Sequence, residues 1–155
     1  MRASRIPRNK YNEHCWIIGE PEIGDGTWIG AFTVIDGSGG LKIGRGCEIS
    51  SGVHVYTHST VKRCVSGKKL RGDGTVNRDI IERAPVSIGD HTFVGANSTI
   101  LMGVSIGDHC VVGAGSLVLE GTVIPSYSVV VGVPAKIIKR LGKTHERKKK
   151  ARTQA

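Results

Sequence analysis

Histidine is the residue type in this chain best suited to chemistry near neutral pH, and its six copies include two notable pairs. His54 and His58 lie in the stretch VHVYTHST, whereas His91 and His109 each follow Ile-Gly-Asp. A neutral imidazole can accept a proton as a general base, or it can ligate zinc. A zinc site would need three converging ligands. We therefore expect no metal, and we expect His91 and His109 to be polar surface residues.

The four cysteines, Cys15, Cys47, Cys64 and Cys110, form no Cys-X-X-Cys pair. Cys64 could in principle carry an acyl group as a nucleophile, but nothing around it indicates a lowered thiol pKa. No apolar secretory segment precedes the cysteines, and no stretch approaches the roughly 20 apolar residues of a membrane span. We expect free thiols in a reducing cytoplasm and no integral membrane segment.

A repeat of six residues organises most of the chain. Aliphatic residues recur without a gap at Ile88, Val94, Ile100, Ile106, Val112, Val118, Ile124 and Val130. Four positions after each of them stands a residue that is mostly small: Thr92, Ser98, Val104, Cys110, Ser116, Thr122, Ser128 and Pro134. The same pattern occurs earlier at Ile23, Ile29 and Ile35 and, after a slip of two residues, at Ile43, Ile49 and Val55. An amphipathic helix would need apolar spacings of three and four, so the repeat predicts strands.

A unit of six residues suffices for one short strand and one corner, with the aliphatic and the small residue both pointing inward. Three units then close one coil, and coils stack at the strand spacing of about 4.8 Å. His91 and His109 are three units apart, so they should lie above one another at a corner. Cys47 and Cys110 fall on the small inward position, so we expect both in the core.

The repeat is interrupted by a long insertion at residues 61–85. Long loops inside compact domains are usually functional, and the interior of such a coil stack is filled with side chains and cannot hold a substrate. Asp36 lies at the earlier slip, in VIDGSGG. A bulge there could aim its carboxylate toward a bound substrate, or Asp36 could complete a turn with Gly37.

The end of the chain changes pattern. In AKIIKRLGK, Ile137, Ile138 and Leu141 would share one face of a short C-terminal helix that closes the coil stack. Residues 136–155 contain nine Lys or Arg and one acid, whereas residues 1–135 contain 13 and 12. We therefore expect one domain over 1–141, with residues 1–20 as a cap or arm, and a solvated basic tail over 142–155. No stacking aromatics or known motif indicate nucleic acid binding.

Three stretches carry a resemblance to a known family: GVHVYTHSTV, APVSIGDHTFVGANSTILMGVSIGDHCVVGAGSLV and VVVGVPAKIIKR. Over roughly residues 23–141 the chain resembles the hexapeptide-repeat acyltransferases, and is most similar to the galactoside, maltose and polysaccharide O-acetyltransferases. The resemblance implies a left-handed parallel β-helix, a homotrimer and acetyl-CoA as cosubstrate. It also implies that the inserted loop walls off the acceptor near a neighbouring subunit.

The resemblance further implies a set of site residues. These are catalytic His58, acceptor-binding Asp36, and coenzyme A-binding Ala96, Ala114 and Lys136. From its position in the repeat unit we expect His54 to line the same cleft and bind the acceptor, and we expect Phe93 to bind coenzyme A by packing on its pantetheine arm. Two positions depart from the family pattern: Ser59 stands where Pro or Asp is frequent, and Leu119-Glu120 stands where Thr-Lys is frequent.

The resulting expectation is an all-β acetyltransferase that acts on a hydroxyl of a saccharide, polysaccharide or glycan precursor. A sugar hydroxyl is a weak acid, so its attack on a thioester needs a base such as His58. N-acetylation of a nucleotide-linked amino sugar is one alternative, and a non-catalytic scaffold or anion-binding protein is another. A zinc carbonic anhydrase class also resembles this repeat, but His54 and His58 lack its spacing.

Overall fold

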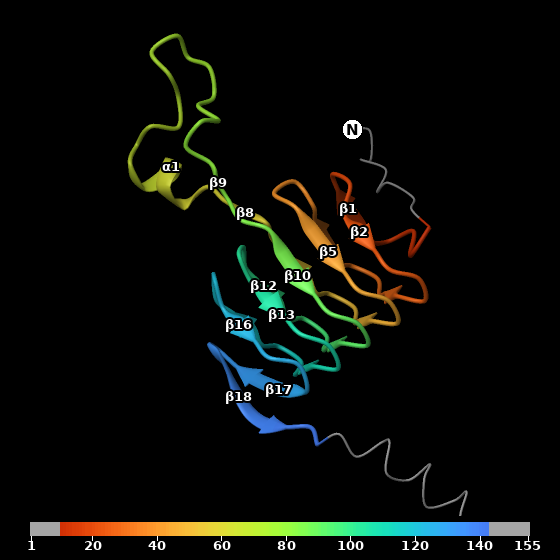
Figure 1. Ribbon diagram of the computed structural model, residues 1–155. Coiled ribbons are helices and arrows are strands. Elements are labelled where there is room, and N and C mark those ends of the chain that lie inside the picture. Colours follow the sequence, from red (N-terminus) through yellow and green to blue (C-terminus); the bar gives the residue numbers. More distant parts are fainter. Residues whose placement is uncertain (1–9, 143–155) are drawn as a thin grey trace, which may run out of the picture.

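The computed structural model describes residues 10–142, and these form a column of stacked coils from which one long segment projects (Figure 1). Residues 1–9 of the expected cap or arm and the basic tail after Gly142 lie outside the described residues. Each coil has three short strands, one in each of three sheets. Within residues 10–142, no helix has the length and apolar character needed to cross a membrane.

The three sheets run along the column, and every pairing within them is parallel except the last. The first sheet contains, in spatial order, β1 (Trp16–Ile18), β4 (Val34–Asp36), β7 (His54–Val55), β12 (Thr99–Ile100) and β15 (Leu117–Val118). The second contains β2 (Glu22–Ile23), β5 (Leu41–Ile43), β10 (Val86–Ile88), β13 (Ser105–Ile106) and β16 (Val123–Ile124). The third contains β3 (Trp28–Ile29), β6 (Glu48–Ile49), β11 (Phe93–Val94), β14 (Val111–Val112), β17 (Ser128–Gly132) and β18 (Ala135–Arg140). The predicted all-β parallel β-helix of hexapeptide repeats is confirmed.

The core follows the repeat. The repeating aliphatic residues from Ile29 to Val130 are all 3% exposed or less. The small inward position holds buried residues from Thr92 to Ser116 and again at Ser128. Several hydroxyls at this position donate to backbone carbonyls, as Ser98 Oγ does to Gly113 O at 2.9 Å. The cysteines Cys15, Cys47 and Cys110 are buried, as predicted for the last two, and Cys64 is exposed.

The insertion leaves the column at one corner of the third coil. It begins with β8 (His58–Ser59) and the short helix α1 (Val61–Val65), and it returns through β9 (Glu82–Arg83). The strands β8 and β9 pair antiparallel, and this two-stranded ribbon is the base of the projecting segment (Figure 1). The ribbon therefore brings the two ends of the insertion together beside the coils.

The predicted C-terminal helix is wrong, because residues 135–140 form β18 and pair antiparallel with β17. The last coil leaves the outer edge of β17 unpaired, and a strand satisfies the backbone groups of that edge while a helix does not. Ile137 and Ile138, both β-branched, favour the extended form. They remain 47% and 62% exposed, so they do not form a buried helix face.

One corner of the column carries a ladder of rings. His91 and His109 stack with their centroids 5.2 Å apart, and Tyr127 continues the stack at 5.0 Å from His109. This is the predicted corner arrangement of the two histidines. Among residues 10–142, no three His, Cys, Asp or Glu side chains gather as a metal site would require.

Candidate active site

The shortest contact between ionisable side chains in the described chain joins His58 and Asp36. His58 Nδ1 lies 2.6 Å from Asp36 Oδ2. The His58 side chain is 34% exposed and the Asp36 side chain is fully buried. The carboxylate thus lies behind the imidazole, and only the imidazole is open to solvent.

The slip in the repeat places these two residues together. β4 and β7 pair with Ile35 opposite Val55, whereas the regular coil that joins β12 to β15 places Ile100 opposite Val118. The coil from Ile35 to Val55 is therefore two residues longer than a regular coil, because the corner that follows Asp36 is enlarged. Asp36 is the last residue of β4, and His58 begins β8 shortly after the end of β7. The corner of one coil therefore meets the start of the insertion in the next coil.

Backbone and hydroxyl groups hold the Asp36 carboxylate in place. Oδ1 accepts a hydrogen bond from Ser38 N at 3.0 Å, the Asx turn that the sequence allowed. Oδ2 accepts bonds from Thr57 N at 3.0 Å and from Thr57 Oγ1 at 3.1 Å. Gly39 N donates to the same Thr57 hydroxyl at 2.8 Å, which ties the two coils together at this corner.

These contacts keep Asp36 ionised. Burial alone would raise the pKa of Asp36, but the hydrogen bonds from Ser38, Thr57 and His58 outweigh it and hold the pKa well below its usual range. An ionised carboxylate only accepts hydrogen bonds, so Nδ1 of His58 carries the proton. A neutral His58 then presents the lone pair of Nε2, the atom with which an imidazole can act as a base.

The other expected acceptor contact, His54, lies elsewhere on the wall. Its strand β7 pairs with β4 and β12, and its Nδ1 is 3.2 Å from the hydroxyl of Tyr56. Within residues 10–142, no hydrogen bond or ion pair joins His54 to His58 or Asp36. The resemblance implied acceptor binding by Asp36, and in the structure its buried carboxylate contacts His58.

The residues expected along coenzyme A extend over the third sheet and one corner. Phe93 is 40% exposed on β11. Ala96 and Ala114 occupy the same corner of successive coils, where Ala96 O accepts a bond from Gly115 N at 2.8 Å. The coils approach so closely here that a Cβ at Gly95 would collide with the backbone of Ala114.

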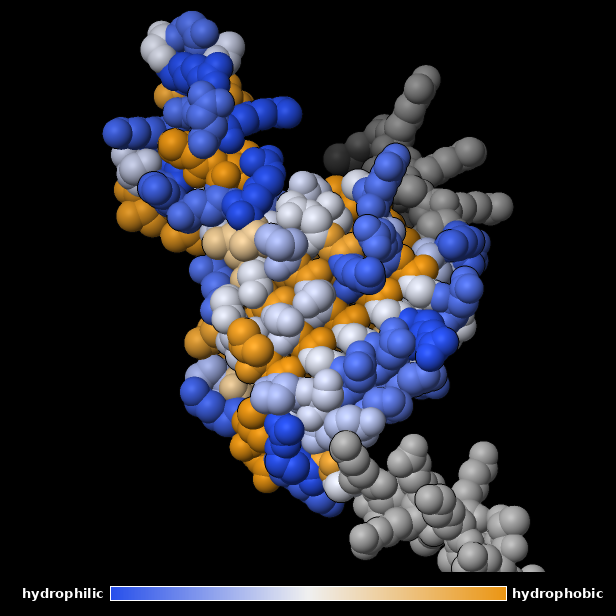
Figure 2. Space-filling view, viewed as in Figure 1, coloured by the Kyte–Doolittle hydropathy of each residue, from blue (hydrophilic) through white to orange (hydrophobic). Residues whose placement is uncertain are grey.

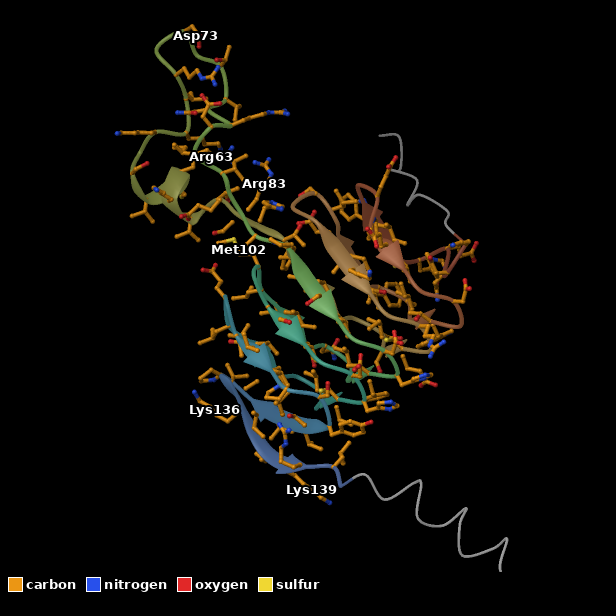
Figure 3. The ribbon with its side chains drawn as sticks, viewed as in Figure 1. Arg63, Asp73, Arg83, Met102, Lys136 and Lys139 are labelled. Carbon is orange, nitrogen blue, oxygen red and sulfur yellow. The ribbon has the colours of Figure 1, made fainter. Side chains whose placement is uncertain are left out.

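Lys136 lies at the end of the column, on β18. It lines a pocket of about 350 Å³ together with apolar residues that include Leu119, Val123, Pro134 and Ile137. Figure 3 shows Lys136 at the opposite end of the body from Arg83. The structure therefore separates this cation from the His58 site.

Sequence reasoning missed three residues at the site. Thr57 entered it only as part of a Thr-His pair and Ser38 only as part of VIDGSGG, yet both bond to Asp36. Arg83 was not singled out, although β9 places it directly opposite His58. The alternation of Val53, Val55 and Thr57 on the inward side could have indicated that Thr57 is buried.

A family model described as the hexapeptide repeat of succinyl-transferase matches residues 22–57 and 85–120. A 2,3,4,5-tetrahydropyridine-2,6-dicarboxylate N-acetyltransferase of Lacticaseibacillus casei is 51% identical over 80 residues, which are 50% of this chain and 33% of that protein. A serine acetyltransferase of Staphylococcus xylosus is 34% identical over 134 residues, 81% of this chain and 53% of that protein. The chain thus spans one third to about half the length of these curated relatives.

Solved structures show the same fold. AntD, an N-acyltransferase from Bacillus cereus in complex with dTDP and 3-hydroxybutyryl-CoA, is 27% identical with a TM-score of 0.73, covering 93% of this chain and 75% of that one. A hexapeptide-repeat acetyltransferase from Vibrio cholerae, complexed with acetyl coenzyme A, is 30% identical with a TM-score of 0.62, covering 79% and 61%. The chain is thus similar in its repeats to this family model and in its fold to these acyltransferases.

Proposed function

We propose that this chain transfers the acetyl group of acetyl-CoA to a hydroxyl group of a saccharide, with His58 as the general base. The observation that carries the proposal is the 2.6 Å contact between His58 Nδ1 and the buried Asp36 carboxylate. A base that must deprotonate an alcohol needs a fixed tautomer and an exposed second nitrogen. The acetyl-CoA complex of the Vibrio cholerae neighbour supports the choice of donor.

The transfer is direct, with both substrates bound. Nε2 of His58 takes the hydroxyl proton while the acceptor oxygen attacks the thioester carbonyl, which forms the C–O bond. The tetrahedral intermediate then collapses, the C–S bond breaks, and the proton leaves with the coenzyme A sulfur. Asp36 stays ionised and stabilises the transient imidazolium. Cys64 is exposed in the projecting segment and has no part in this sequence.

The donor would lie along the groove between neighbouring columns of a homotrimer in the cytoplasm. Its pantetheine arm would pass Phe93 and the corner at Ala96 and Ala114, and its nucleotide phosphates would meet Lys136. The inserted segment and His54 would face the acceptor.

N-acetylation is the second candidate, because two of the relatives are named as N-acetyl- or N-acyltransferases. An amine that is already unprotonated can attack a thioester with less help from a base. The two reactions therefore differ in how strongly they should depend on His58.

The test is thiol release from acetyl-CoA by the purified full chain, against free sugars, amino sugars and nucleotide-linked sugars. We expect release with a hydroxyl acceptor and an O-acetyl ester as product. Amide products alone would favour the second candidate. An absence of thiol release with every acceptor would favour the non-catalytic scaffold.

A further inference from the structure

The two-stranded ribbon at the base of the insertion places a cation directly across from the proposed base. In the pairing of β8 with β9, His58 lies opposite Arg83 and Ser59 lies opposite Glu82. Residues directly opposite in an antiparallel pair extend to the same side, with Cβ atoms about 4.5–5.5 Å apart. The pairing therefore directs the Arg83 and His58 side chains to the same side of the ribbon and the Glu82 side chain to the other side.

The charge of Arg83 is not matched by any acid in residues 10–142. Two other arginines of the insertion have partners: Arg71 pairs with Asp79 at 2.7 Å, and Arg63 donates to Asn77 O at 3.4 Å. Arg83 is exposed, and within residues 10–142 its side chain makes no hydrogen bond or ion pair. Figure 3 shows Arg63 and Arg83 near the base of the projecting segment and Asp73 at its far tip.

The surrounding segment adds to the positive charge. Residues 61–85 contain seven Lys or Arg and three acids. Figure 2 shows this segment as mainly hydrophilic with small hydrophobic patches. In the proposed function, the phosphates of coenzyme A meet Lys136, which lies at the other end of the body from Arg83. The donor therefore supplies no anionic partner for Arg83.

From these observations we infer that Arg83 binds a phosphate group of the acceptor, so the acceptor is a phosphorylated saccharide rather than a free one. This rests on the proposed function, because it names the acceptor class of the His58 site. A guanidinium offers two parallel N–H donors that fit the oxygens of a phosphate. A phosphate held there would place the attached sugar beside Nε2 of His58.

The first measurement compares three acceptors with the same sugar: neutral N-acetylglucosamine, its 1-phosphate, and UDP-N-acetylglucosamine, which adds a second phosphate and a uridine. We expect kcat/KM to be at least about tenfold higher for a phosphorylated acceptor than for the neutral sugar. A preference for the nucleotide form over the 1-phosphate would identify a nucleoside diphosphate as the source of the phosphate. Equal values for all three would overturn the inference.

The second measurement compares Arg83→Gln with Arg78→Gln, a matched control that removes one cation from the same segment. Arg83→Gln should raise the acceptor KM and reduce the preference for phosphate to below about threefold, while the KM for acetyl-CoA changes little. Arg83→Lys should restore part of the preference, because it retains the charge without the paired donors. Arg78→Gln should retain all of it. Equal losses in both Gln variants, or a loss confined to acetyl-CoA, would contradict the inference.

A third measurement needs no turnover: calorimetric titration of inorganic pyrophosphate into the full chain saturated with coenzyme A. We expect binding that Arg83→Gln weakens at least about fivefold and Arg78→Gln leaves within about twofold. Binding that depends on Arg83 without any acetyl transfer would contradict the proposed function and leave an anion site. Acetyl transfer without such binding would contradict the inference alone.

Discussion

The Asp36 carboxylate receives hydrogen bonds from two backbone N–H groups and the Thr57 hydroxyl in addition to His58. These bonds fix the carboxylate independently of the imidazole, so the orientation of His58 follows from the corner of the neighbouring coil. We interpret Asp36 as a positioning residue, since no substrate can reach its fully buried side chain. The exposed imidazole is then the group that meets the acceptor.

Replacing Asp36 by Asn should lower kcat by roughly 10²-fold or more, because the amide no longer selects the tautomer with a free Nε2. The KM for acetyl-CoA should stay within about twofold. Steady-state kinetics with a hydroxyl acceptor measure both constants. An unchanged kcat in the Asp36→Asn variant would contradict the positioning role.

The same substitution should also alter stability in a pH-dependent way. Since the folded pKa of Asp36 lies below its usual value of about 4, the ionised carboxylate stabilises the fold above that pH. This stability is lost as the pH falls from about 4 toward the folded pKa. We expect Asp36→Asn to cost about 1–3 kcal/mol at pH 7, with the difference from wild type shrinking below pH 4. Urea unfolding at several pH values measures the difference in free energy of unfolding between wild type and Asp36→Asn. A difference that stays constant with pH would contradict the stabilising role of the ionised carboxylate.

The sequence predicted the members of the site better than their contacts. His58 was recognisable because it stands where the repeat breaks, and Asp36 because it stands at the slip. The contact between Asp36 and His58 was not predictable. Their separation in the sequence exceeds one regular coil, so whether the side chains meet depends on how the enlarged corner folds. Arg83 was hidden for another reason: nothing in residues 61–85 indicates that Glu82–Arg83 returns as a strand beside His58.

The short strands of the column depend on side chains that fill its interior layer by layer. Val112 on β14 is fully buried, whereas Val123 on β16 is 71% exposed. The repeat predicted this difference, because Val112 occupies the aliphatic position and Val123 stands one residue before that position. The six-residue period therefore predicted the strands and the core together, because each repeat unit supplies one short strand and one inward aliphatic residue.

These two valines offer a matched test of the core. Val112→Ala should lower the free energy of unfolding by about 2 kcal/mol, from the two lost methyl groups and the cavity they leave. Val123→Ala should change it by less than about 0.5 kcal/mol. Chemical denaturation of both variants gives the values. Equal losses of unfolding free energy in the two variants would contradict the assignment of Val112 to an inward and Val123 to an outward position.

The end of the column was predicted wrongly because local periodicity competes with a tertiary edge. The spacing of Ile137, Ile138 and Leu141 suits one face of a helix, but the unpaired edge of β17 provides hydrogen-bonding partners for a strand. Sequence patterns describe which side chains share a face. They do not reveal an open backbone edge, which exists only once the coils are stacked.

Lys136 on β18 is expected to meet the phosphates of the donor. Lys136→Ala should raise the KM for acetyl-CoA about tenfold, the loss expected from one charged contact to a phosphate. Deletion of the residues after Gly142 should leave that KM within about twofold, because the basic run is expected to be solvated. Initial-rate kinetics give the KM for acetyl-CoA of the Lys136→Ala variant and of the tail deletion. A large, salt-sensitive rise on deletion would show instead that the tail binds the donor.

The proposed donor groove needs a second copy of the column. Phe93, Ala96 and Ala114 lie on an outer wall of one chain, and a single wall cannot enclose a pantetheine arm. Sedimentation combined with activity across a dilution series should show activity confined to a trimer. An active monomer would contradict the shared groove.

Proton transfer from a hydroxyl acceptor to His58 is the step on which the proposed reaction depends, and the turnover of His58→Ala measures it. The matched control is His14→Ala, which removes an exposed imidazole from the region of the first coil. We predict that His58→Ala lowers kcat roughly 10²- to 10⁴-fold with the KM for acetyl-CoA nearly unchanged, and that His14→Ala retains wild-type turnover. Near-wild-type turnover of His58→Ala on the true acceptor would contradict the role of His58 as base and favour transfer to an amine.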